Sequence, residues 1–275
     1  WNGLAIAALA DASRSLSASG DPALVAAAIR YRDAATRAAD AVVGNLRTPE
    51  GRLRRSWRDG RASSDGVLED YADLADGLLA LYEATFEERW FDAATGLVDI
   101  VLTRFGHPDG GFYDTPDDGE RLVARPRDVQ DNATPSGGSM TATVLLRLAA
   151  LTGEDRYRAA AERAIGALGP LLELHPTAFA QWLSALAAAH APSTEVAIVG
   201  DPGSDATRSL VTVLDRGYHP FRVQAVGATP EASTVPLLRD RVAIDDRPTA
   251  YACHGFACRL PVTEPEALDA LLVGT

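Results

Sequence analysis

The sequence predicts a mainly α-helical fold: a partial (α/α)6 toroid of helical hairpins with a small C-terminal α/β unit. The main observation is a pattern that occurs three times, an aromatic residue followed by apolar residues at i+3, i+4, i+7, i+8 and i+11, which is one face of a helix. The aromatic residues are Tyr31, Trp90 and Tyr157. Their spacing of about 60 to 67 residues fits one hairpin plus a long loop. Because such a hairpin buries its core only against its neighbours, we expect the long loops on one side of a toroid.

Nearly apolar helices alternate with amphipathic ones, as expected for an inner and an outer ring. Asp21 and Pro22 supply an N-cap and a first helical residue, and Thr85 to Glu88 is a capping-box sequence. A closed ring of six hairpins needs twelve helices, whereas we count seven, so we expect an incomplete ring, or one closed by sequence before Trp1 or by another chain. The helix expected at 2–18 is apolar all round, so we expect it to be buried on all sides. The expected inner helices span 2–18, 66–84, 137–151 and 177–190; the outer ones span 22–46, 85–105 and 154–169, with loops at 47–64 and 106–135.

The helical periodicity of the sequence gives way to short apolar runs after Pro192. Short apolar runs at 195–200, 221–226 and 249–257 are typical of strands, and 206–214, capped by Asp205, and 264–272 read as helices. We therefore expect two parts: residues 1–191, the toroid, incomplete at its N-terminus, and residues 192–275, a small α/β unit.

Composition excludes several functions. The net charge is −12 and the pI is about 4.8, so no nucleic-acid partner is expected. All 26 basic residues are arginine, which excludes Schiff-base chemistry and a standard phosphate-binding loop. No apolar run reaches the roughly 18 residues of a membrane span. We expect a cytoplasmic protein from a GC-rich, bacterial genome, without a cofactor, and with its native start upstream of Trp1 because the sole methionine is Met140.

The catalytic candidates are carboxylates at two expected helix starts. Glu69 and Asp70 open the helix at 66–84, and because adjacent helical positions diverge by about 100°, at most one of them acts as a general acid or base. The alternative is a solvated acidic stripe, formed by Glu69, Asp73, Asp76 and Glu83, whose first carboxylates favour the helix dipole. Asp131, which precedes the helix at 137–151, is the expected partner carboxylate.

Three loops supply candidate substrate-binding residues. The loop 52–61 is locally basic and carries Trp57 and Arg58, which suit a sugar ring and an anionic group; the alternative is a loop of solvated charges. Segment 110–115 contributes Tyr113 and Asp114, the alternative being a β-turn with one ring in the core. Segment 128–139 contributes Ser136 and a glycine-rich helix start, a potential anion site; the alternative is close packing of helix starts.

Cys253 and Cys258 do not have the spacing of a zinc site, and no second pair exists, so no metal is expected. In a continuous strand, an offset of five places the two side chains on opposite faces. We therefore expect buried free thiols.

These motifs, in this order, resemble the C-terminal portion of thioredoxin-domain-containing proteins of the YyaL and spermatogenesis-associated protein 20 type. The resemblance covers nearly the whole chain; one departure is Gly138, where the family usually has Asn. It implies a thioredoxin-like domain N-terminal to a barrel that is similar to those of N-acylglucosamine 2-epimerases and six-hairpin glycosidases. The matching residues are Trp1 to Leu4, Leu68 to Ala72, Leu81 to Thr85, Gly110 to Tyr113, Pro135 to Gly137 with Ser139, and Tyr251 to Thr263. Trp1, Asn2 and Tyr71 of these motifs join the candidate substrate-binding residues.

The leading hypothesis is a carbohydrate-active barrel, a sugar epimerase, isomerase or hydrolase, with a small-molecule carbohydrate as its partner. A glycosidase-like reaction needs two carboxylates about 5 to 10 Å apart, and we expect Glu69 or Asp70 with Asp131. The alternative is a non-catalytic scaffold or ligand-binding module serving the missing thioredoxin-like domain. A thiol or metal function at Cys253 and Cys258 is the third hypothesis.

Overall fold

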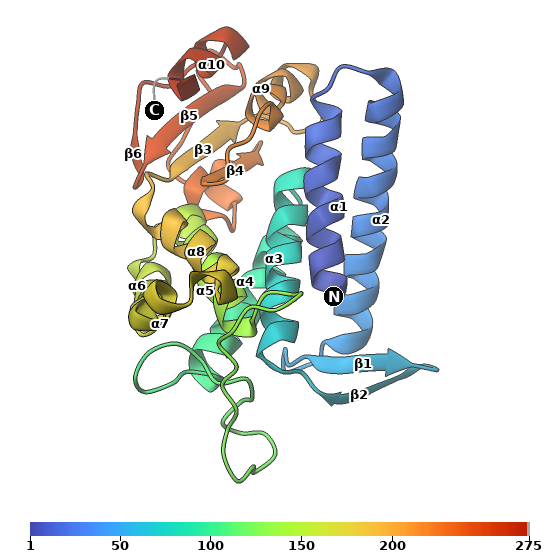
Figure 1. Cartoon of the computed structure of the whole chain (residues 1–275). Helices are drawn as coiled ribbons and strands as arrows, with labels where there is room; N and C mark the ends of the chain where they lie inside the picture. The colour runs from blue at the N-terminus through green and yellow to red at the C-terminus, as the bar shows by residue number, and fades with distance from the viewer. Residues whose placement is uncertain (274–275) are drawn as a thin grey trace.

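The computed structural model describes residues 1–273 and contains alternating inner and outer helices, as predicted (Figure 1). Consecutive inner helices contact one another, and each outer helix packs on the inner helix that precedes it. A short helix, α7 (Gly169–Leu174), follows the third hairpin, where the sequence predicted a connection between the helices at 154–169 and 177–190. The inner helices are α1 (Asn2–Ser17), α3 (Leu68–Thr85), α5 (Gly137–Thr152) and α8 (Ala180–His190), and the outer ones are α2 (Pro22–Leu46), α4 (Glu88–Arg104) and α6 (Asp155–Gly166).

The repeated aromatic pattern lies on the three outer helices. Trp90 on α4 and Tyr157 on α6 are buried, at 2% and 0% exposure, whereas Tyr31 on α2 is 39% exposed. Ala35 and Ala39, which follow Tyr31 on the same face of α2, are fully buried. The pattern therefore marks the packing face of each outer helix, although the first aromatic ring is only partly covered.

Helix α1 is buried on one side only, so the prediction of burial on all sides is wrong. It packs against α2 and α3, and its remaining face, which includes Ala5, Ala8 and Asp11, is exposed. Small apolar residues on this face gave no signal that would separate a fully enclosed helix from one at the open edge of an incomplete ring.

The long connections gather at the N-terminal ends of α1, α3 and α5, as predicted, and the α/β unit lies at the opposite end (Figure 1). The predicted loop 47–64 contains an unpredicted hairpin of β1 (Arg54–Arg58) and β2 (Arg61–Asp65), in which Trp57 pairs with Ala62. All ten residues of these strands are exposed, so the sequence lacks the alternation of apolar and polar residues that would predict a strand.

The predicted caps had mixed outcomes. The Asp21 carboxylate accepts the Ala23 N–H at 2.7 Å, as expected. The capping box at Thr85 is wrong, because Thr85 ends α3 and Phe86 takes a left-handed φ of 58°. The cap of α9 (Asp205–Asp215) is Ser204 rather than Asp205, since the Ser204 hydroxyl accepts the Thr207 N–H at 3.2 Å.

The C-terminal part is a four-stranded sheet of order β4-β3-β5-β6. Strand β3 (Thr194–Val199) pairs in parallel with β4 (Arg222–Gly227) and antiparallel with β5 (Thr249–His254). Val196 and Ile198 pack in a cluster with residues of α9 and of α10 (Pro265–Val273), while Ala197 of the same strand belongs to the core of the toroid. One face of the sheet therefore shares the core of the toroid.

The expectation of two free thiols is wrong, because Cys253 and Cys258 form a disulfide. The predicted strand 249–257 is in fact a hairpin: the chain turns at Gly255 and Phe256, which have φ of 54° and 65°, and returns as β6 (Ala257–Cys258). Cys253 and Cys258 are therefore cross-strand partners. An offset of five places side chains on opposite faces only in a strand that continues straight.

Among the helices of residues 1–273, none is long and apolar enough to cross a membrane.

Candidate functional site

The groove at the N-terminal ends of the inner helices, called the N-end groove below, has a volume of about 310 Å³. It lies where the starts of α3 and α5 meet the long loop between α4 and α5. Of the residues singled out from the sequence, it brings together Glu69, Asp114 and Ser136. Most of its lining residues are polar or charged, and the lining comprises Arg55, Val67, Glu69, Asp114, Thr115, Pro126, Asp128, Gln130, Asn132, Thr134, Pro135, Ser136 and Gly137.

Glu69 and Asp70 occupy different environments at the start of α3, as their divergence along the helix requires. The Glu69 carboxylate is half-exposed and lies 2.6 Å from the Arg55 guanidinium of β1. The Asp70 carboxylate accepts the Val67 N–H at 2.9 Å and so caps its own helix, and burial raises its pKa. Glu69 therefore faces the groove, while Asp70 stabilises the helix start beside it.

Asp114 is the second carboxylate of the N-end groove. One of its oxygens accepts the Asp128 N–H at 2.8 Å, and its backbone carbonyl accepts the Leu68 N–H at 2.9 Å, which fixes the loop against α3. Burial raises the pKa of the Asp114 carboxyl, and the charges of Asp128 and Glu69 act in the same direction. A carboxyl group that retains its proton at higher pH than usual, beside one held in an ion pair, is the arrangement that acid/base chemistry requires.

Asp131 has a capping role in this structure. One oxygen accepts the Ser136 N–H at 2.9 Å and the Ser139 hydroxyl at 2.6 Å, and the other accepts the Gln181 N–H at 2.9 Å. It therefore joins the starts of α5 and α8, and it does not line the N-end groove.

Ser136 and the glycines after it also serve helix packing. The Ser136 hydroxyl accepts the Ser139 N–H at 3.2 Å as the N-cap of α5. A Cβ on Gly137 would lie 2.8 Å from the Glu69 nitrogen, and one on Gly138 would lie 2.9 Å from the Trp182 ring. Close packing of helix starts, the alternative considered for this segment, therefore accounts for both glycines.

The remaining aromatic candidates do not line the groove. Tyr71 is buried at 1% exposure, and its hydroxyl accepts the Leu53 N–H at 2.9 Å. The Tyr113 ring contacts His107 and lies 3.9 Å from the Arg125 guanidinium carbon. In the same turn Phe112 is buried, and the two preceding glycines have positive φ, as in the β-turn alternative.

Four further candidates lie on exposed surface. Trp57 and Arg58 are on β1, where Trp57 is half-exposed and Arg58 pairs with the neighbouring Asp59. Trp1 and Asn2 are exposed at the start of α1. Arg55 is the member of this basic loop that reaches the groove, and nothing in the sequence distinguishes it from its neighbours.

The acidic stripe of α3 is largely buried. The alternative of a solvated stripe is therefore wrong for Asp73 and Glu83. Asp73 and Glu83 are 7% and 3% exposed. Burial raises the pKa of Asp73 to about 7, and one of its carboxylate oxygens is buried without a hydrogen-bond partner. The opposite face of the same helix, represented by Leu68, Leu78 and Tyr82, is also buried.

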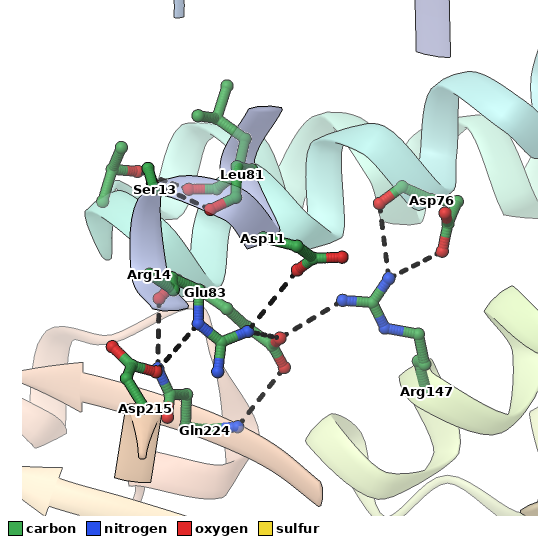
Figure 2. Close-up of polar contacts among 11 residues, drawn as sticks. Asp11, Ser13, Arg14, Asp76, Leu81, Glu83, Arg147, Asp215 and Gln224 are labelled. Carbon is green, nitrogen blue, oxygen red and sulfur yellow. Dashed lines mark hydrogen bonds and ion pairs between the residues drawn. The ribbon is translucent and has the colours of Figure 1, made fainter. Parts of the chain in front are cut away.

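A second and larger hollow, called the C-end cavity below, was not predicted. It has a volume of about 440 Å³ and lies between the C-terminal parts of the inner helices and the α/β unit. Arg14 of α1 pairs with Glu83 at 2.9 Å and with Asp215 at 3.0 Å, and Arg147 of α5 pairs with Glu83 at 3.2 Å (Figure 2). These residues come from four elements that lie far apart in the sequence, so no local motif could predict the cavity.

Over residues 1–273, no group of three or more histidine, cysteine or acidic side chains is placed to hold a metal ion.

The architecture defines the class: an incomplete α/α toroid that is covered at one end by an α/β unit and carries a carboxylate-lined groove at the other. Among curated proteins, the chain is similar to spermatogenesis-associated protein 20 of Rattus norvegicus, with 32% identity over 236 residues, and of Homo sapiens, with 33% over 213 residues. These alignments cover 81% and 75% of this chain but only 30% and 27% of the relatives. The chain belongs to this spermatogenesis-associated protein 20-like family, and it spans about a third or less of the length of these relatives.

Two further comparisons are more distant. An uncharacterized protein of Caenorhabditis elegans, B0495.5, is 26% identical over 280 residues, which is 98% of this chain and 37% of that protein. Among solved structures, cellobiose 2-epimerase from Spirochaeta thermophila aligns with a TM-score of 0.45 and 19% identity, covering 61% of this chain and 42% of that one. A likeness at this level bears on neither reaction nor ligand. No protein-family model matches the chain.

Proposed function

We propose that the N-end groove binds a small polyhydroxylated molecule of the carbohydrate class and performs acid/base chemistry on it, as a sugar epimerase, isomerase or hydrolase does. The observation that carries the proposal is that two carboxyl groups in different environments, Asp114 and Glu69, line one groove. Asp114, whose pKa burial raises, is the proposed acid, and Glu69, paired with Arg55, is the proposed base.

The rest of the groove suits a hydroxylated ligand. Asp128, Gln130, Asn132 and Thr134 bring carboxylate, amide and hydroxyl groups, which donate to and accept from sugar hydroxyls. The volume of about 310 Å³ lies at the lower end of the range of small-molecule sites. A monosaccharide is therefore a better match for the groove than a longer oligosaccharide.

The partner role first assigned to Asp131 passes to Asp114 in this proposal. All of the hydrogen bonds described above for Asp131 serve helix starts, so removing its carboxylate would test folding rather than chemistry. Asp70 remains a supporting residue, because its carboxylate caps α3 and lies 3.7 Å from the same Arg55 guanidinium that holds Glu69.

The test measures the melting temperature of the 275-residue chain with neutral sugars, amino sugars, uronates and sugar phosphates, for the wild type and for Glu69→Gln and Asp114→Asn. Asp99→Asn is the matched control, because Asp99 is a half-exposed carboxylate that pairs with Arg156 on the outer ring. We expect one sugar class to raise the melting temperature of the wild type and of the control, but not of the groove variants.

Chemistry is tested with the sugar that binds. Proton abstraction in D2O would place deuterium on a sugar carbon, which proton NMR detects, whereas hydrolysis would release a reducing end. Loss of either signal in both Glu69→Gln and Asp114→Asn supports the assignment. Binding without turnover would remove the acid/base part of the proposal and leave a ligand-binding groove.

A second candidate function is a non-catalytic module that packs against a thioredoxin-like domain. The exposed face of α1, with Ala5 and Ala8, and the exposed side chains of Leu24 and Ile29 on α2 favour it. Crosslinking mass spectrometry on a longer family member would test this candidate. Crosslinks between a thioredoxin-like domain and α1 or α2 would support it, and crosslinks confined to other surfaces would exclude it.

A further inference from the structure

The C-end cavity is built on buried ion pairs, and Arg222 is the arginine of its lining that takes part in none of the ion pairs among residues 1–273. Arg14 bridges Glu83 and Asp215, and Arg147 bridges Asp76, at 2.6 Å, and Glu83 (Figure 2). Glu83 is thus shared between the two arginines, while Asp215 pairs with Arg14 and Asp76 with Arg147. The side-chain amide of Gln224 donates at 3.2 Å to Asp215 and to the Glu83 backbone carbonyl, which fixes this wall of the cavity.

Arg222 is the cation without a partner. It begins β4 and lines the cavity, and its guanidinium makes no hydrogen bond or ion pair with any of residues 1–273. Its Nη1 is buried. Burial and the neighbouring charge of Arg14 lower the pKa of Arg222 to about 10, although the charges of Asp215 and Glu83 act against this shift. A desolvated guanidinium without a partner destabilises the folded state unless a counter-charge approaches it.

The other charges of the cavity do not supply that partner. Arg158 lies 3.7 Å from Glu162, an ion pair on the exposed surface of α6. The Asp11 carboxylate lies on the α1 wall, and the ion pair it forms is with Arg14, at 3.8 Å. His219 also lines the cavity, and burial together with the charge of Arg222 lowers its pKa. An imidazole is neutral or cationic, so it cannot supply a negative charge to Arg222.

We propose that the C-end cavity is a second binding site, separate from the N-end groove, for a small hydroxylated molecule that carries one oxyanion group, a carboxylate or a phosphate, which pairs with Arg222. A guanidinium binds either group through two parallel hydrogen bonds. Thr143, Gln181 and Ser184 add uncharged donors and acceptors to the lining, which suit the hydroxyl groups of such a molecule. The volume of about 440 Å³ accommodates a molecule of this size.

The segment between α9 and β4 forms one side of the cavity. Gly217 to Phe221 contribute to its lining, and Tyr218 within this segment is 87% exposed. A ligand held by Arg222 would therefore contact both the toroid and the α/β unit, and its binding should stabilise the two parts against each other.

The experiment titrates the 275-residue chain with inorganic phosphate and, separately, with D-gluconate, following heat by calorimetry at constant ionic strength. Three variants accompany the wild type: Arg222→Gln, Arg222→Lys, which keeps the charge, and Arg208→Gln as a matched control. Arg208 is an exposed arginine on α9 that pairs with Asp205 away from the cavity. Because Arg222 has no partner to lose, Arg222→Gln should melt as cooperatively as the wild type.

We expect saturable binding of at least one anion, weakened roughly tenfold or more in Arg222→Gln, weakened less in Arg222→Lys and unchanged in Arg208→Gln. Phosphate alone identifies a phosphorylated ligand, gluconate alone a sugar acid, and both support the shared oxyanion chemistry. No saturable binding to the wild type, or equal binding to Arg222→Gln, overturns the proposal. Glu69→Gln should bind these anions like the wild type, so failure at one end of the toroid is distinguishable from failure at the other.

Discussion

The guanidinium of Arg14 on α1 lies 2.9 Å from the carboxylate of Glu83 on α3, so a buried ion pair joins the first hairpin to the second. Glu83 is 3% exposed and also binds Arg147 of α5, which makes it the meeting point of three inner helices. Its carboxylate also accepts the Gln224 N–H of β4 at 3.3 Å. Glu83 therefore links three inner helices of the toroid to the α/β unit.

Glu83→Gln should destabilise the chain by about 3 kcal/mol, at the lower end of the range for breaking a buried ion pair, because each arginine keeps a second carboxylate. Urea unfolding measures the free energy of unfolding. Asp205→Asn, which removes an exposed pair with Arg208, should change it by roughly 0.5 kcal/mol or less. A loss below about 1 kcal/mol in Glu83→Gln would show that the network contributes little to stability.

Gly77→Ala should be strongly destabilising, because a Cβ at this position of α3 would lie 2.5 Å from the Gly3 carbonyl oxygen of α1. The two backbones would have to separate, at a cost of about 1–3 kcal/mol or more. Gly44→Ala on α2 is the control: its Cβ would meet nothing within 4 Å, so it should stabilise by about 0.5–1 kcal/mol through helix propensity. Melting temperatures that shift in the same direction for both variants would contradict this close approach of α1 and α3.

Asp73 should make stability depend on pH. Burial raises its pKa to about 7 in the folded chain from an ordinary value of 3.8, so the folded state holds the proton that the unfolded state releases. Its contribution therefore becomes steadily more destabilising as pH rises from about 4 to 7, and it is constant above pH 7. At its full extent this penalty is about 4 kcal/mol.

Asp73→Asn removes this titration. The difference in unfolding free energy between the variant and the wild type should grow from pH 4 to 7 in favour of the variant, and then stay level. Urea unfolding at four pH values measures it, with Asp99→Asn, which removes a half-exposed carboxylate, as the matched control. A constant difference across this range would mean that Asp73 is ionised at its ordinary pKa.

The disulfide between Cys253 and Cys258 closes a short loop, so replacing both residues by serine should cost roughly 2 kcal/mol. Without reductant, iodoacetamide should label neither sulfur of the folded chain. After reduction, Cys258 should react first, because it is exposed and lies 3.2 Å from the Arg241 guanidinium, whereas Cys253 is fully buried. Peptide mass mapping reads the order, and prompt labelling before reduction would contradict the bond.

The sequence predicted the toroid well because helical periodicity is a strong and local signal. The faces marked by Trp90 and Tyr157 bury as expected, and the inner helices begin and end within a few residues of the predicted positions. The β1–β2 hairpin escaped prediction because both of its faces are exposed. The β5–β6 hairpin did so because Phe256, a residue with no turn preference, takes a positive φ beside Gly255.

The site was predicted only in part, because a sequence does not tell which loop carboxylates are used by backbone amides. Asp114 and Asp131 both lie in the loop before α5, yet one lines the groove and the other caps two helices. The C-end cavity depends on contacts between residues about 70 to 200 positions apart, such as Arg14 with Asp215. No pattern within one element could indicate it.

Hydrogen–deuterium exchange of the chain with each sugar class tests the proposed groove most directly. We expect at least one class to slow exchange of the amides in 67–70, 114–115 and 126–137, which surround Glu69 and Asp114, in the wild type but not in Asp114→Asn. Exchange that stays unchanged in these segments with every sugar, or slows equally in Asp114→Asn, would contradict it.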